Sequence, residues 1–190
     1  MKTQGIEKWV RILTVPPLMA LAALSILLAV RPAIFDGVGN YLAAVFFLTV
    51  LPLLAYPLQP ILPHYKDQGR AGQRKLAMLM AVAGYVAGAV MGIVCVVPKG
   101  LMQIYLIYLI SGVLTLLFNK VFKIKASGHA CGIAGPVAYL VYFVGWPALA
   151  GCIVLAMAYW ASLRMGRHTW PELLLGSAIP VAVTVLLACL

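Results

Sequence analysis

The sequence predicts an all-α protein, a polytopic integral membrane bundle of about seven transmembrane helices, with six helices as the alternative. The first observation is composition: of 190 residues, 64% are hydrophobic and only 9% are charged, whereas soluble domains carry about 25% charged residues. The second is a series of apolar stretches that are each long enough, or nearly long enough, to cross a bilayer. The third is an uneven distribution of positive charge between those stretches.

The apolar stretches divide the chain into seven predicted spans. A spanning helix needs about 20 mostly apolar residues, with about 17–25 tolerated. The longest connection, residues 59–75, is rich in proline and glycine, which predicts a loop without a long helix. No soluble insertion interrupts the pattern, so residues 1–190 are predicted to form a single transmembrane domain. The predicted spans are residues 10–30, 39–58, 76–97, 101–118, 129–145, 147–164 and 170–190.

Positive charge is concentrated on one side of the predicted membrane. With seven spans, twelve of the fourteen Lys and Arg residues lie on the side of the N-terminus, and only Arg31 and Lys99 lie on the other. Loops rich in Lys and Arg remain in the cytoplasm, so the N-terminus is predicted to be cytoplasmic in a multi-pass cell-membrane protein. If the first stretch does not span, six helices remain and the distribution becomes nine to five.

The net charge of +10 also bears on the partner. In a soluble protein this balance would suggest nucleic acid. In a membrane protein it indicates attraction to anionic lipid headgroups. The predicted partner is therefore the lipid bilayer and not nucleic acid, and the oligomeric state is left open.

Two polar stretches interrupt the apolar chain. The first, N-K-V-F-K-I-K-A-S-G-H, covers residues 119–129, and the second covers residues 162–172. His129 ends the first stretch and His168 lies in the second. Because two complete crossings separate these histidines, both are predicted to lie at the same face of the membrane. Polar groups beside a bilayer are costly and usually functional, so the two stretches are predicted to form one site.

The residue types in these stretches favour binding of a phosphate. Ser127 and Gly128 stand where a helix begins, and the free N–H groups and positive dipole end there attract an anion; Ser127 can equally cap the helix. Glu172 follows His168 by four residues, and a carboxylate beside an imidazole fixes its tautomer. Arg164 precedes His168 by four residues, which places both on one face if the helix continues. The cations predicted to bind phosphate oxygens are Lys120, Lys125, Arg164 and Arg167.

Two histidines amid cations suit phosphoryl transfer, in which positioning and electrostatic stabilisation do most of the work. The chain has only four acids, Glu7, Asp36, Asp67 and Glu172, which are too scattered for a magnesium or two-metal site. The four cysteines lie in apolar runs without metal-site spacing. The sequence therefore predicts no metal and no cofactor.

These motifs resemble those of the type 2 phosphatidic acid phosphatase (PAP2) superfamily, the integral-membrane lipid phosphatases that need no metal. The S-G-H at 127–129 is similar to its second motif, P-S-G-H, with Ala126 in the proline position. The G-R-H-T-W-P-E run at 166–172 is similar to its third motif, with Glu in place of Asp. Residues 125–130 also resemble a branch of short bacterial and archaeal chains. The resemblance covers about residues 115–190, the predicted catalytic part.

The resemblance implies a role for each site residue. His168 would attack phosphorus and form a phosphohistidine, Glu172 would orient and polarise it, and His129 would protonate the leaving alkoxide. The phosphate oxygens would be held by Lys125, Ser127, Gly128 and an arginine.

The sequence departs from the family pattern at three places. The first motif, a lysine followed six residues later by Arg-Pro, has no counterpart, and lysines directly before Ser127 stand in its place. The arginine that usually lies six residues before the third-motif histidine is Ser162, so Arg164 or Arg167 is expected to replace it. Glu172 stands where the family has Asp.

Three functions stay open at this point. The first is a phosphatase for phosphatidic acid, phosphatidylglycerol phosphate or an isoprenyl phosphate or diphosphate. The second is a degenerate PAP2-like protein that binds or transports a phosphorylated lipid without turnover. The third is a basic membrane protein with incidental histidines, which predicts that His129 and His168 lie far apart.

Overall fold

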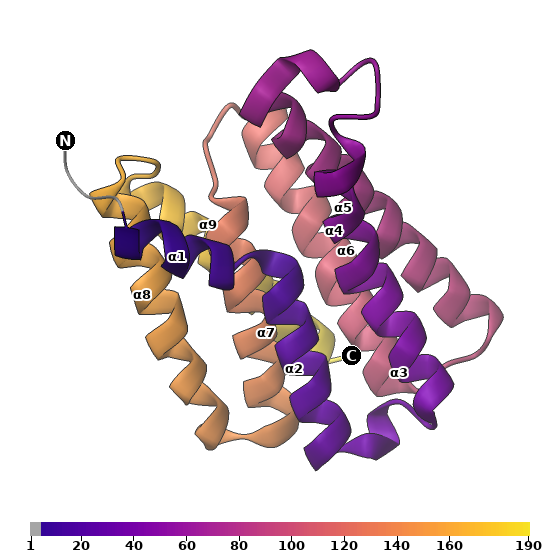
Figure 1. Ribbon diagram of the computed structural model, residues 1–190. Coiled ribbons are helices and arrows are strands. Elements are labelled where there is room, and N and C mark those ends of the chain that lie inside the picture. The colour runs from indigo at the N-terminus through magenta and orange to yellow at the C-terminus, as the bar shows by residue number, and fades with distance from the viewer. Residues whose placement is uncertain (1–4) are drawn as a thin grey trace.

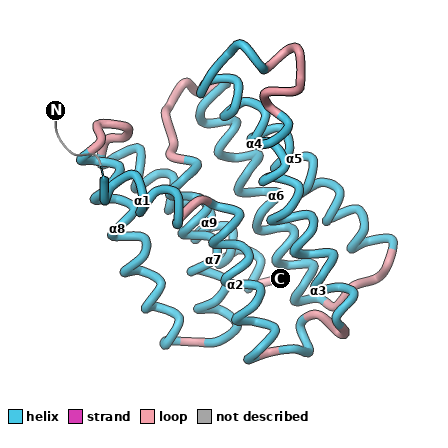
Figure 2. Tube along the Cα trace, viewed as in Figure 1, coloured by secondary structure: helices cyan, strands magenta, loops and turns pink. Residues whose placement is uncertain are grey.

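The described residues, 5–190, are all helical or loop in the computed structural model, without a strand in that range (Figures 1 and 2). Three short 3-10 helices (η1 Pro32–Ile34, η3 Lys66–Gln68 and η4 Trp146–Ala150) and one π-helical turn (η2 Phe46–Val50) join the longer elements. The nine α-helices within residues 5–190 are α1 (Gly5–Leu13), α2 (Pro16–Val30), α3 (Val38–Val45), α4 (Leu51–Leu58), α5 (Gly69–Val94), α6 (Lys99–Lys120), α7 (Gly128–Val144), α8 (Gly151–Arg164) and α9 (Trp170–Ala188).

Each of the seven predicted spans is largely helical, but seven spans are not confirmed. Helices α1 and α2 are long and apolar enough to cross a membrane only when they are taken together, and the pair is bent by 52°. Counted as one span, the pair would be the sixth. Helix α7 is apolar but has only 17 residues, a length of about 25 Å at 1.5 Å per residue. The chain is consistent with a multi-pass membrane protein. Five helices are long and apolar enough to cross a membrane: Val38–Leu58, Lys66–Val94, Lys99–Lys120, Trp146–Arg164 and Trp170–Ala188.

The first predicted span, residues 10–30, is wrong over its first turns because the helix breaks before Pro16. Proline disfavours the helical conformation in the residue before it, and Val15 is extended with φ −60° and ψ 141°. Pro16 then begins α2, where its missing N–H leaves no bond unmade. As a result α1 turns away from α2 and lies across the end of the bundle, beside α8 (Figure 1).

The second span contains Pro52 but remains one continuous helix from Val38 to Leu58. Proline cannot donate the main-chain hydrogen bond of a regular helix, and the π-helical turn η2 lies directly before it. Gly84 of α5 packs against this turn, since a side chain there would overlap the carbonyl oxygen of Phe47. The glycines of α5, spaced four residues apart at 84, 88 and 92, therefore allow close packing within the chain.

The predicted loop 59–75 is wrong at its end, because α5 begins at Gly69. Arginine, alanine, glutamine and lysine follow this glycine, and all are good helix formers. The glycine content of the stretch concealed that preference.

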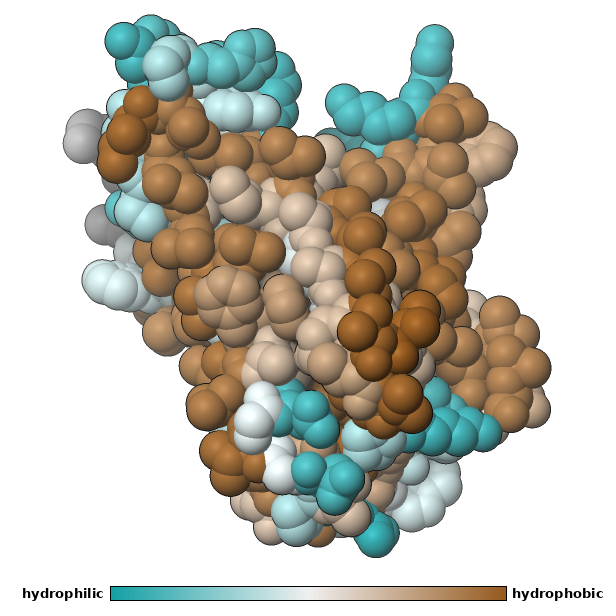
Figure 3. Space-filling view, turned by 90° about the vertical axis from the view of Figure 1, so that its right-hand side faces the viewer, coloured by the Kyte–Doolittle hydropathy of each residue, from teal (hydrophilic) through white to brown (hydrophobic). Residues whose placement is uncertain are grey.

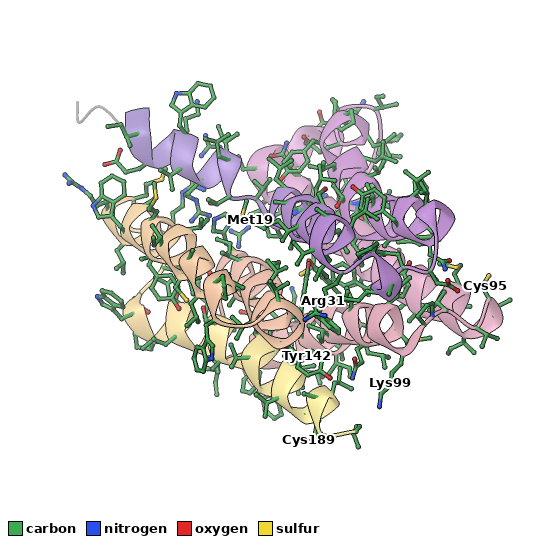
Figure 4. The ribbon with its side chains drawn as sticks, turned by 90° about the horizontal axis from the view of Figure 1, so that it is seen from below. Met19, Arg31, Cys95, Lys99, Tyr142 and Cys189 are labelled. Atoms are coloured by element: carbon green, nitrogen blue, oxygen red, sulfur yellow. The ribbon has the colours of Figure 1, made fainter. Side chains whose placement is uncertain are left out.

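Apolar surface covers the middle of the molecule, and hydrophilic atoms gather towards its ends (Figure 3). Arg31 and Lys99 lie on the underside of the bundle (Figure 4). Lys99 donates to the main-chain oxygen of Leu190 at 3.1 Å, which places the C-terminal end beside it. The polar stretches before α7 and α9 lie at the other end.

Candidate functional site

The two polar stretches meet where α7 and α9 begin. The main-chain N–H of Ser127 donates to the main-chain oxygen of Glu172 at 2.9 Å. Gly176, one turn further along α9, lies directly against the backbone of Ser127, so that a side chain there would overlap its carbonyl group. The structure therefore brings residues 125–129 and 168–172 together at one end of the bundle, so the wide separation of the histidines that the third hypothesis predicts is not observed.

This contact yields a prediction for stability. Gly176→Ala is expected to destabilise the protein by about 1–3 kcal/mol, because the added methyl group must displace backbone in a packed contact. Gly128→Ala is the matched control, since a Cβ there meets nothing within 4 Å. Thermal unfolding in detergent checks both variants. Equal melting temperatures for the two would contradict the described contact.

The loop before α7 is held in place by Asn119. Its side-chain amide donates to the Ala126 carbonyl at 3.1 Å, and its side-chain oxygen accepts from the Ala126 N–H at 3.1 Å. Ser127 is fully buried, and its Oγ caps α7 by accepting from the Ala130 N–H at 3.3 Å. The structure thus gives Ser127 the capping role, while Gly128 is exposed at the start of the helix.

Glu172 connects His168 to a lysine. His168 Nδ1 and Glu172 Oε2 are 2.7 Å apart, and Lys125 Nζ lies 3.1 Å from the same oxygen. The Thr169 N–H also donates to this oxygen at 3.3 Å. A carboxylate accepts hydrogen bonds, so Nδ1 of a neutral His168 carries the proton and its Nε2 bears a free electron pair.

The surroundings of His168 favour its neutral form. Burial lowers the pKa of His168 below its ordinary value of 6.5, and the charges of Lys125 and Arg11 lower it further, whereas the hydrogen bond and charge of Glu172 raise it. The net direction is downward, so at neutral pH the ring is uncharged. A neutral imidazole is the form that can act as a nucleophile.

His129 contacts a residue that the sequence analysis did not select. Its Nε2 lies 3.0 Å from Oγ1 of Thr14, directly after α1. The Thr14 hydroxyl donates its only hydrogen to the Val10 carbonyl at 2.7 Å, so the His129 Nε2–H must be the donor to Thr14. His168, Arg11 and Arg167 all lie close enough to His129 to act on it through charge.

Arg11 is the second residue that the sequence analysis missed. Its guanidinium donates to Ser162 Oγ at 2.6 Å, and Ser162 is fully buried. Arg11 also lies close enough to Arg74 and Arg167 to be repelled by them. Among the ion pairs within residues 5–190, none includes Arg11. A partly buried guanidinium without a counter-ion, beside other cations, is suited to an anionic ligand.

The hydrogen bond between Arg11 and Ser162 also bears on which arginine belongs to the site. Arg164 or Arg167 was expected to take the place of an arginine at position 162, but the guanidinium that contacts Ser162 is that of Arg11, from α1. The signal that could have revealed it is weak: an arginine and a threonine three residues apart, directly before the Pro16-Pro17 break. Nothing in their spacing from the histidines, more than 100 residues away, indicates the contact.

Three predicted phosphate-binding cations have different surroundings. Helix α8 ends at Arg164 and the chain turns at Gly166, whose φ is +61°. The shared helical face proposed for Arg164 and His168 therefore does not form, and Arg164 pairs with Glu7 at 3.6 Å instead. Arg167 is exposed near His129. Lys120 is exposed at the end of α6, and no hydrogen bond or ion pair among the described residues joins it to the site.

Within residues 5–190, His, Cys, Asp and Glu side chains form no group of three that could hold a metal ion. Comparisons of the chain with models of known protein families, with curated proteins and with solved structures found no match.

Proposed function

We propose that this chain is a membrane phosphatase that hydrolyses a phosphate ester of a lipid or an isoprenoid through a phosphohistidine. The observation that carries the proposal is the His168–Glu172 contact of 2.7 Å, which leaves Nε2 of His168 unprotonated beside Arg11, Lys125 and His129. A free imidazole nitrogen oriented by a carboxylate and surrounded by donors is the arrangement that nucleophilic phosphoryl transfer requires.

The proposed reaction has two steps. In the first, the electron pair of His168 Nε2 attacks phosphorus, the bond from phosphorus to the ester oxygen breaks, and His129 gives a proton to the leaving alkoxide. In the second, His129 takes a proton from water, whose oxygen attacks phosphorus, and the bond to His168 breaks with release of inorganic phosphate. His129 must be an imidazolium in the first step. Burial and the charges of Arg11 and Arg167 disfavour that form, and the negative charge of the bound phosphate favours it.

The arrangement of the chain supports a lipid substrate. The site lies at the end of an apolar bundle, so a phosphate held there can remain attached to a tail that lies between helices in the bilayer. The charge distribution of the loops favours the cytoplasmic leaflet. We therefore propose phosphatidic acid, phosphatidylglycerol phosphate and isoprenyl phosphates or diphosphates as the substrates to be tried first.

Covalent trapping tests this proposal. Purified protein in lipid vesicles is incubated with phosphatidic acid or an isoprenyl phosphate in EDTA, and released phosphate is measured. An acid quench is avoided because phosphohistidine is acid-labile, and peptide mass spectrometry then locates the phosphoryl group. Phosphate release together with phosphorylated His168 is expected. Binding of the lipid without release would instead support the non-catalytic alternative, which the existing Lys125–Glu172 pair favours because it already satisfies one phosphate-binding cation.

The pH dependence of the reaction follows from His168. Because its pKa is lowered below 6.5 and the neutral ring is the nucleophile, the acid-side fall in kcat/KM is expected at a pH below 6.5, and loss of the proton of His129 adds a separate fall towards higher pH. Glu172 raises this pKa, so Glu172→Gln should move the acid limb to still lower pH while reducing the maximal rate. Rates measured from pH 4.5 to 8 in both proteins check the direction. A limb that moves to higher pH in the variant would contradict the assignment.

A further inference from the structure

Helix α1 has two faces of opposite character. Ile6, Trp9 and Leu13 are 70%, 64% and 61% exposed, and their spacing of three and four residues places them on one side of the helix. The adjoining side carries buried Val10 together with the partly buried Glu7 and Arg11. That side packs against α8.

The docked side of α1 is tied to the site and to α8 by polar contacts. Arg11 donates to Ser162 at 2.6 Å, Glu7 pairs with Arg164 at 3.6 Å, and Thr14, in the turn after α1, accepts from His129 at 3.0 Å. The face of Ile6, Trp9 and Leu13 therefore points away from the bundle while the other face supplies two residues of the candidate site.

The direction of α1 identifies what its apolar face meets. The helix is bent by 52° from α2 and lies across the end of the bundle instead of along it (Figure 1). An amphipathic helix in this orientation beside spanning helices lies in the plane of the membrane surface. Tryptophan favours the headgroup level, and Trp9 is central to the exposed face.

Charge selects the kind of membrane surface. Lys8 is exposed on α1, and Arg74, Arg164 and Arg167 lie at the same end of the molecule, since Arg74 and Arg167 are close enough to repel Arg11 and Arg164 pairs with Glu7. Cations beside an apolar helical face attract anionic lipid headgroups.

We propose that α1 is an interfacial helix: its face of Ile6, Trp9 and Leu13 lies in the headgroup region of an anionic leaflet. Binding of this face to the membrane holds Arg11 and Thr14 in the candidate site. The first half is independent of any catalytic activity. The second half rests on the proposed phosphatase function, because its readout is turnover.

Fluorescence quenching tests the first half. A variant with Trp146, Trp160 and Trp170 replaced by phenylalanine leaves Trp9 as the only tryptophan. The full chain is reconstituted in vesicles that contain phosphatidylglycerol and lipids brominated at a shallow or a deep acyl position. Stronger quenching by the shallow bromine is expected. Quenching that is strongest with the deep bromine, or absent with both, would overturn the proposal, as would cross-linking between two copies through position 9, because the face would then be a protein contact.

Activity tests the second half. Trp9→Ser and Leu13→Ser should each lower kcat/KM on a vesicle-borne lipid phosphate by about fivefold or more, since α1 binds the membrane less strongly when it buries less apolar area there. Val185→Ser, at a site on α9 that is equally apolar and 59% exposed, is the matched control and should retain the parent rate. Unchanged rates in the two α1 variants would overturn the positioning role. Headgroup-level quenching in a protein that releases no phosphate would leave the interfacial helix standing and overturn the proposed phosphatase.

Discussion

His168→Ala is expected to abolish phosphate release, with a loss of roughly 10³-fold or more, because removal of a nucleophile leaves only binding and electrostatic effects. The change removes the proposed attacking nitrogen and the hydrogen bond to Glu172. Phosphate release from a vesicle-borne lipid phosphate measures the effect. His64→Ala is the matched control, since His64 is an exposed histidine on the loop before α5 and should leave the rate unchanged.

A second histidine variant separates the two proposed steps. His129→Ala retains the nucleophile and loses the proton donor, so it should fail on a lipid alkoxide but react in part with p-nitrophenyl phosphate, whose leaving group needs no proton. Retention of lipid turnover in His168→Ala would show that another group is the nucleophile. Equal losses on both substrates in His129→Ala would show that this residue acts in binding and not as an acid.

Arg11→Met is expected to lower kcat/KM by about 10²–10³-fold, the usual effect of removing a preorganised donor from a developing anion. Methionine retains an unbranched chain of similar reach but has no charge. Thermal stability is expected to be unchanged or higher, because a partly buried cation that Arg74 and Arg167 repel is removed.

The matched control for this arginine is Arg164→Met. Arg164 is an arginine at the same end of the bundle, but it contacts Glu7 and the ring of Trp160, so its loss should change the rate only a few-fold. Arg11→Lys distinguishes charge from geometry, since lysine cannot form a bidentate contact. An Arg11→Met protein with parent activity would show that Arg11 is not part of the site, and Arg167 would then be the arginine to test.

The helical class and the approximate positions of the apolar helices could be predicted because a bilayer imposes long apolar runs. Adjacency of the S-G-H and R-H-T segments was also predictable, since an even number of crossings returns the chain to the same face. The helix break before Pro16 could not be predicted from the sequence. Proline is tolerated at a helix start whether the preceding residues continue in line or turn, so the sequence did not separate one helix from two.

The shared helical face predicted for Arg164 and His168 is absent for a related reason. Helical periodicity places Arg164 and His168 on one face only while the helix lasts, and the left-handed turn at Gly166 ends that register. The spacing of Glu172 from His168 indicated the correct contact, although the helix begins only at Trp170. That contact forms through the first turn of α9, where Glu172 also accepts from Thr169 in a capping box. Contacts from α1 depend on tertiary packing that no local pattern encodes.

Glu172 takes part in the site through two chemically separate groups. Its carboxylate contacts His168 and Lys125, whereas its peptide oxygen receives the Ser127 N–H and so fastens α7 to α9. Amino-acid replacement alters the first of these directly and leaves the second available, because every residue supplies a main-chain carbonyl oxygen. Variants at position 172 therefore keep the main-chain contact between α7 and α9 but change the carboxylate's contacts with His168, Lys125 and Thr169. Replacement by the shorter aspartate would measure what one methylene contributes to those contacts and to catalysis.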